Sequence, residues 1–144
     1  SPMPSSCPRG SFRRAALMAL ALLAPFGAGC HRESPEQLNV VQAMAEVLGK
    51  RNPQRLALAC ALAVPEHQDP LSCDNLIVPM LHYAPGFPGS KVTRRGPARW
   101  GLFGKPWTLP VHYEGQNGSG NLDVTMRFEK KTRVWRIYSL LPVP

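Results

Sequence analysis

The sequence predicts an α+β domain in which N-terminal helices pack on a curved antiparallel β-sheet, a meander. Two observations lead to this prediction. Apolar residues recur at helical spacing in the segments between residues 35 and 83, whereas from residue 91 onward they alternate with polar residues as they do in strands. Short turns separate the later segments, so consecutive strands are expected to pair as neighbours. Helices followed by a run of strands is the element order of an α+β fold.

Three helical segments are expected before the sheet, of which the first two form either two short helices or one helix kinked near Gly49. The first begins at Pro35, after Ser34 as a candidate N-cap, and the second begins near Asn52 and stops at Pro65. The third lies within residues 70–83, where Pro79 is expected to leave it short or irregular. The apolar face of the first helix consists of Leu38, Val41, Met44, Ala45 and Leu48.

Five strands are expected after residue 90, over 91–95, 98–103, 107–113, 122–129 and 134–141. The clearest is 122–129, where every second residue is apolar, which indicates one buried and one solvated face. Pro110 indicates that its strand is at an edge or bulged. The glycine-rich segment 114–121 is expected to be a loop.

The first 29 residues resemble a bacterial lipoprotein signal peptide. Arg13 and Arg14 precede an apolar run over 15–24, and small residues lead to Cys30. The resemblance implies cleavage before Cys30, its acylation by fatty acids such as palmitate, a tether over 30–34 and one domain over 35–144. Because His31 follows the cysteine, it also implies a lipid anchor at the periplasmic face of the outer membrane. An ordinary cleaved signal and a spanning helix are the alternatives, although the run is shorter than the about 20 residues a span needs.

The net charge is +8, and it is +5 for the chain from Cys30 onward, which has 14 basic and 9 acidic residues. An excess of this size favours anionic headgroups or an acidic partner. A solvated basic surface without a partner is the simpler alternative. No nucleic-acid-binding motif is recognised, so nucleic acid is not an expected partner.

Cys60 and Cys73 are expected to form a disulfide, because export would place them in an oxidising compartment. The alternative is a metal site with His67 and His82. The spacing Cys-x6-His-x5-Cys-x8-His matches no common zinc motif, so we predict neither a metal nor a cofactor.

No residue pattern typical of catalysis is found, and the chain is predicted not to be an enzyme. The segment 115–120 is rich in glycine but joins two strands, whereas a phosphate loop leads into a helix. A His82–Asp74 pair is the remaining acid-base candidate, and it needs reach to a substrate. A candidate interaction patch is formed by Arg99, Trp100, Phe103, Lys105 and Trp107, because aromatic residues and arginine often anchor interfaces. The alternative is that Trp100 and Trp107 close the open end of the sheet.

The element order and the segment Lys131-Thr132-Arg133-Val134-Trp135-Arg136-Ile137 resemble the NTF2-like superfamily, especially small bacterial lipoproteins with such a domain. The resemblance covers about residues 35–141 and implies helices in the concavity of a curved sheet. The superfamily includes enzymes, transport factors and secretion components, so the fold does not decide function.

We expect a non-enzymatic, membrane-tethered periplasmic lipoprotein that acts as a binding or assembly module in an envelope or secretion complex. Its partner would be an envelope protein or a small ligand. The alternatives are an immunity or inhibitor lipoprotein against an envelope-acting toxin, and an enzyme of the NTF2-like type.

Overall fold

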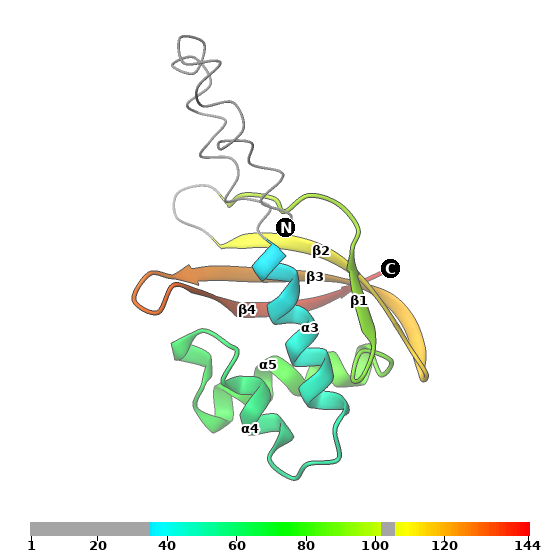
Figure 1. Ribbon diagram of the computed structural model, residues 1–144. Helices are drawn as coiled ribbons and strands as arrows, with labels where there is room; N and C mark the ends of the chain where they lie inside the picture. Colours follow the sequence, from blue (N-terminus) through cyan, green and yellow to red (C-terminus); the bar gives the residue numbers. More distant parts are fainter. Residues whose placement is uncertain (1–34, 102–105) are drawn as a thin grey trace. The chain divides into compact units, whose positions relative to one another are not determined.

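The computed structural model describes residues 35–101 and 106–144, and residues 36–144 belong to one compact unit. The expected signal peptide, Cys30 and the tether lie outside the described residues. Helices precede strands along the chain, so the predicted α+β class is confirmed (Figure 1). The elements are α3 (Pro35–Gly49), α4 (Arg55–Cys60), the 3-10 helix η3 (Pro65–His67), α5 (Pro70–Tyr83), β1 (Lys91–Arg94), β2 (Trp107–Gly115), β3 (Gly118–Glu129) and β4 (Val134–Val143).

The four strands form one antiparallel sheet in the order β1-β2-β3-β4, a meander. A register shift between Thr125 and Met126 marks a bulge in the β3–β4 pair. The strand expected over 98–103 is not continuous: its described part makes an isolated bridge between Arg99 and Thr108, and residues 102–103 lie outside the described part.

Pro110 lies in an interior strand whose pairing with both neighbours shows no register shift, so the prediction of an edge or bulged strand was wrong. β2 pairs with both β1 and β3. The last residue of β1, Arg94, pairs with Val111, and the Pro110 carbonyl accepts a hydrogen bond from Arg95 N at 2.9 Å. The N–H and C=O of a strand residue point to the same side, so the N–H that Pro110 lacks would face β1. Because β1 ends at Arg94, before the position opposite Pro110, the β1–β2 ladder loses no hydrogen bond.

The loop expected over 114–121 is a two-residue turn, because β2 and β3 remain paired as far as Gly115 and Gly118. Glycine composition suggested a loop, but at least one of these glycines serves packing within the sheet. A Cβ on Gly120 would lie 2.6 Å from the hydroxyl oxygen of Tyr113, the residue opposite it. Only glycine leaves the space that this tyrosine ring occupies.

Helix α5 is continuous through Pro79, contrary to the expected interruption. Asp69 caps its N-terminus by accepting a hydrogen bond from Ser72 N at 3.1 Å. Pro79 cannot donate to the carbonyl of Asn75, but both residues are exposed. Water can therefore satisfy that carbonyl, which lowers the cost of the proline.

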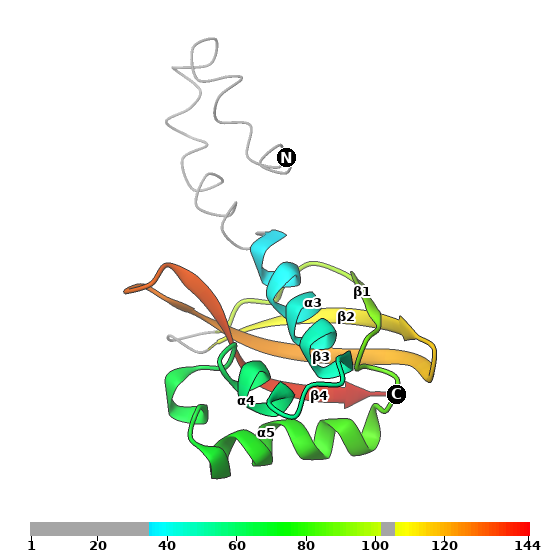
Figure 2. The same ribbon diagram turned by 60° about the horizontal axis from the view of Figure 1, so that its bottom comes forward.

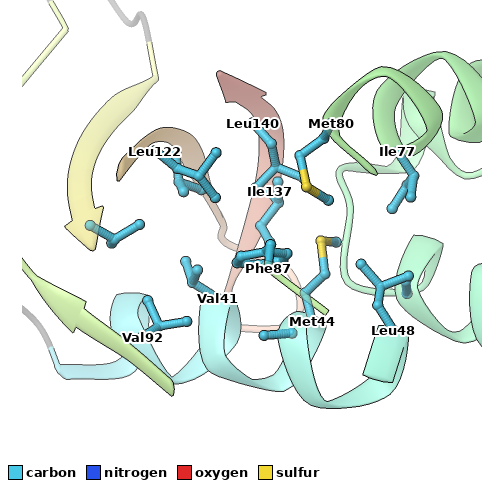
Figure 3. Close-up of a cluster of buried hydrophobic side chains, with 14 of the residues drawn as sticks. Val41, Met44, Leu48, Ile77, Met80, Phe87, Val92, Leu122, Ile137 and Leu140 are labelled. Atoms are coloured by element: carbon cyan, nitrogen blue, oxygen red, sulfur yellow. The ribbon is translucent and has the colours of Figure 1, made fainter. Parts of the chain in front are cut away.

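Side chains from α3, α4, α5 and all four strands form one buried apolar cluster. Figure 3 shows Val41, Met44 and Leu48 of α3 facing side chains of β3, β4 and α5. The strand residues of this cluster are Val92, Leu109, Val111, Tyr113, Leu122, Val124, Met126, Trp135, Ile137 and Leu140. Burial of these side chains is the main source of stability, at about 25 cal/mol per Å² of apolar surface.

A disulfide joins two of the helices, and backbone hydrogen bonds join the helical segment to the sheet. Cys60 of α4 and Cys73 of α5 form the predicted disulfide, with Cα atoms 5.8 Å apart. The chain after α4 also pairs in parallel with the outer edge of β4: Val64 N donates to Ile137 O, and Ile137 N donates to Leu62 O, both at 2.9 Å. This pairing covers part of an edge that would otherwise expose unpaired backbone groups.

Candidate interaction surfaces

Trp100 and Trp107 of the predicted patch stack on each other. Their ring centroids are 6.1 Å apart with an interplanar angle of 29°. Trp107 begins β2 and packs against the buried cluster, whereas Trp100 is 55% exposed. The two rings therefore differ in role: one anchors the stack to the core and the other presents an aromatic surface to solvent. Phe103 and Lys105 of the patch lie outside the described residues.

The segment before this stack is held against the outer face of the sheet by Asp123. The carboxylate accepts a hydrogen bond from Arg95 Nη2 at 2.8 Å and another from Arg99 Nη2 at 3.2 Å. Arg99 also exchanges two backbone hydrogen bonds with Thr108, at 2.7 and 2.9 Å. Arg99 thus positions Trp100 beside Trp107, while its side chain remains 60% exposed.

A second surface, which the sequence reading did not select, is the outer part of the β3–β4 hairpin. We call residues 127–136 the basic arm. β2 begins opposite Met126, so beyond this point β3 and β4 continue as a two-stranded ribbon that projects from the sheet (Figures 1 and 2). The signal that could have found it is the charge run in Arg127-Phe128-Glu129-Lys130-Lys131-Thr132-Arg133-Val134-Trp135-Arg136.

The basic arm holds most of the positive excess of the domain. It has five basic residues and one acidic residue, a net charge of +4. Residues 35–144 as a whole have 13 basic and 8 acidic residues, a net charge of +5, so the remainder has only +1. The excess of positive charge is therefore concentrated on one ribbon, whereas the other eight basic residues are nearly balanced by seven acidic ones.

The paired charges of the arm are those nearest the sheet. Arg127 Nη2 contacts Glu66 Oε1 at 2.6 Å, and this hydrogen bond lowers the pKa of Glu66. Glu129 Oε1 accepts from Thr132 Oγ1 at 2.7 Å and from Arg136 Nε at 2.6 Å, which lowers the pKa of that carboxyl. Within the described residues, the basic side chains at the turn form no ion pair; they are Lys130, Lys131 and Arg133.

Apolar groups lie beside these turn residues. Phe128 and Val134 are each 39% exposed. Phe128 pairs with Trp135 across the ribbon, at 5.4 Å between ring centroids, and Val134 pairs with Glu129. Because neighbouring pairs point to opposite faces, the arm has one half-exposed apolar group on each face.

His112 lies on the outer face of the sheet, in β2. Its Nδ1 is 2.8 Å from Asn121 Oδ1 on the facing residue of β3, and its Nε2 is 3.4 Å from Glu114 Oε2. The hydrogen bond to Asn121 is the main cause of a raised pKa for His112, and the bond to Glu114 adds to it. His112 and Asn121 are brought together by the register of β2 and β3, which the sequence pattern does not show.

The buried interior offers little polar chemistry. Among the described residues, the buried polar side chains are Gln37 and Ser90. Ser90 Oγ donates to Phe87 O, whereas neither amide atom of Gln37 has a hydrogen-bond partner. Asp74 and His82 are eight residues apart on the continuous α5, a rise of about 12 Å, so they do not form an acid-base pair.

The metal alternative loses its thiol ligands, because Cys60 and Cys73 are joined to each other. In the described parts of the chain, no group of three or more His, Cys, Asp and Glu side chains could hold a metal ion. No helix over the same residues is long and apolar enough to cross a membrane.

Comparison of the chain with protein-family models, with curated proteins and with solved structures found no match.

Proposed function

We propose that the protein is a membrane-tethered binding or assembly module of the bacterial envelope, anchored through Cys30 at the periplasmic face of the outer membrane. The observation that carries the proposal is the Trp100–Trp107 stack. Trp107 packs against the buried cluster and holds the stacked Trp100, which is 55% exposed. Because the exposed ring is already positioned by this stack, little side-chain entropy would be lost when a partner binds it. The resemblance of residues 1–29 to a lipoprotein signal peptide supports the anchor.

The composition of the interior favours binding over catalysis. A catalytic pocket of this fold type would need a carboxylate or an imidazole inside the sheet, whereas the buried polar side chains among the described residues are an amide and a hydroxyl. The outer-face groups Asp123 and His112 are committed to Arg95, Arg99 and Asn121. We therefore place the functional surface on the outside of the domain.

An NTF2-like arrangement, with helices in the concavity of a curved sheet, is part of the proposal. It is supported by the helix residues that share the buried cluster with the strands, including Val41, Met44, Ala59 and Ile77. The bulge at Thr125/Met126 also supports it, because bulges bend the strand that contains them.

The anchor is tested by intact-mass spectrometry of the full chain purified from membranes, beside a Cys30→Ala variant. We expect a mass that begins at Cys30 and includes a diacylglyceryl or triacyl addition, and we expect the variant to lack it. A mass without acyl groups that begins at another residue would overturn the tether.

The binding surface is tested by cross-linking in cells, with Trp100→Ala and the matched variant Tyr83→Ala. Tyr83 is 71% exposed and lies at the end of α5, so it controls for loss of a surface aromatic. We expect a cross-linked product with the parent chain and with Tyr83→Ala, and at least tenfold less with Trp100→Ala, because interface aromatics often contribute about 2 kcal/mol or more. An unchanged product with Trp100→Ala would contradict the proposal.

A further inference from the structure

We propose that the basic arm docks the domain on an anionic lipid surface. The proposal concerns residues 127–136 alone, and it does not depend on acylation of Cys30 or on the Trp100 surface.

The distribution of charge is the first argument. The arm has a net charge of +4, whereas the rest of residues 35–144 has +1. Lys130, Lys131 and Arg133 at its turn are exposed, and within the described chain they form no ion pair. Basic residues near an anionic bilayer contribute about 1 kcal/mol each, so three of them at one point give a usable attraction.

The geometry of the arm is the second argument. Beyond Met126 only two strands continue, and the ribbon projects from the sheet in both views (Figures 1 and 2). A projecting turn can reach a surface without a change in the rest of the domain. Arg133 also has a φ of 60°, a left-handed conformation that usually favours glycine or asparagine. The turn therefore presents Arg133 together with Lys130 and Lys131, although the backbone conformation of Arg133 is unfavourable.

The apolar groups of the arm favour lipid over other anions. Phe128 and Val134, one on each face, are each 39% exposed just behind the basic turn. Long lysine side chains can hold their ammonium groups at the headgroup phosphates while apolar neighbours contact the acyl boundary. A nucleic acid or a carboxylate-rich peptide would satisfy the charge, but a lipid surface also provides an apolar boundary for these side chains.

The test uses the full chain with Cys30→Ser, which prevents acylation, and measures co-sedimentation with vesicles. One vesicle preparation is phosphatidylcholine alone, and the other contains roughly a third phosphatidylglycerol, a strongly anionic surface. The arm variant is Lys130→Gln/Lys131→Gln/Arg133→Gln. The matched variant is Lys50→Gln/Arg51→Gln/Lys91→Gln, which removes the same net charge from exposed residues elsewhere. Residues 1–34 are common to all proteins, so their contribution cancels in the ratios.

We expect the arm variant to partition onto anionic vesicles roughly a hundredfold less, because each neutralised charge costs about fivefold. The matched variant should change far less. Raising the ionic strength from about 0.1 M to 1 M should weaken binding of the parent, because the Debye length falls from about 10 to 3 Å. Val134→Thr, which keeps shape and charge, should reduce partition roughly two- to fivefold.

Three results would overturn the proposal. Equal losses in the two triple variants would show that net charge alone drives binding. An unchanged arm variant would show that the arm does not bind lipid. The parent chain could also fail to bind anionic vesicles but bind a short DNA duplex or an acidic peptide through the arm. That result would assign the arm to another partner. The vesicle experiment uses a chain that cannot be acylated, so its outcome does not depend on the mass of the Cys30 protein. Either proposal can therefore be wrong while the other holds.

Discussion

The side-chain amide of Gln42 in α3 bonds the backbone of Val92 in β1. Val92 N donates to Gln42 Oε1 at 2.8 Å, and Gln42 Nε2 donates to Ser90 O at 2.9 Å. The amide thus pairs with the free edge of β1 as a neighbouring strand would, with one donor and one acceptor. These two hydrogen bonds hold the helix α3 against the edge strand β1, which lies 50 residues further along the chain.

Gln42→Met should lower the free energy of unfolding by about 1–3 kcal/mol. Methionine has a similar length but cannot replace either hydrogen bond, so the Val92 N–H and the Ser90 carbonyl lose their partner. Urea unfolding followed by circular dichroism measures the change. Glu46→Met, at an exposed position of the same helix, should stay within about 0.5 kcal/mol. A loss no larger than that of Glu46→Met would show that the amide contributes little.

The same substitution at Gln37 should have the opposite sign. The Gln37 side chain is fully buried and neither amide atom has a partner, so its desolvation is uncompensated. Gln37→Met should raise the free energy of unfolding by about 1 kcal/mol. Measured beside Gln42→Met under identical conditions, a destabilised Gln37→Met protein would show that the amide is satisfied in solution.

Gly49→Ala should destabilise the domain by about 1–3 kcal/mol, because the end of α3 lies against the loop before β1. A Cβ at Gly49 would be 2.5 Å from the Cα and 2.6 Å from the N of Gly89, whose N–H donates to Ala45 O at 2.7 Å. Backbone must therefore shift, and this hydrogen bond with it. Gly96→Ala is the control, since its nearest heavy atom would be Pro110 Cγ at 3.9 Å. Similar melting temperatures for the two variants would refute the prediction.

Reduction of the Cys60–Cys73 disulfide should cost about 3 kcal/mol of stability, because the bond closes a loop with a sequence separation of 13. Urea unfolding with and without a thiol reductant measures it. Cys60→Ala/Cys73→Ala should be insensitive to the reductant. If the parent chain is equally insensitive, the disulfide does not stabilise the fold.

His112 should titrate above the ordinary histidine pKa of about 6.5, and Asn121→Ala should lower its pKa. A raised pKa in the folded state means that the protonated form is favoured by folding. The stabilising contribution is therefore complete below about pH 6.5 and is lost as the pH rises through the higher folded value. Histidine ring resonances followed by NMR over this range check the shift. A pKa at or below 6.5 in the parent chain would contradict it.

The amino-acid pattern alone was enough to predict an α+β fold in which helices come before strands. The residues that form α3 repeat with a helical period and those of β3 alternate with a period of two, because each segment must bury one face. This information is local, so it can be read without knowing what covers the face. The Cys60–Cys73 pairing could also be predicted, because only two of the four cysteines lie after the expected lipidation site at Cys30.

Tertiary structure decided what depended on partners distant in sequence. Pro79 is tolerated because its face of α5 is exposed, and Pro110 because β1 ends beside it. The ion pairs of Asp123 and the hydrogen bond between His112 and Asn121 follow from strand register, which composition does not encode. The basic arm forms because the pairing of β3 and β4 extends beyond the first residue of β2. The burial pattern is a local property of the chain. Strand register and strand length depend instead on which segments pair in the folded protein, and they determine where the candidate surfaces lie.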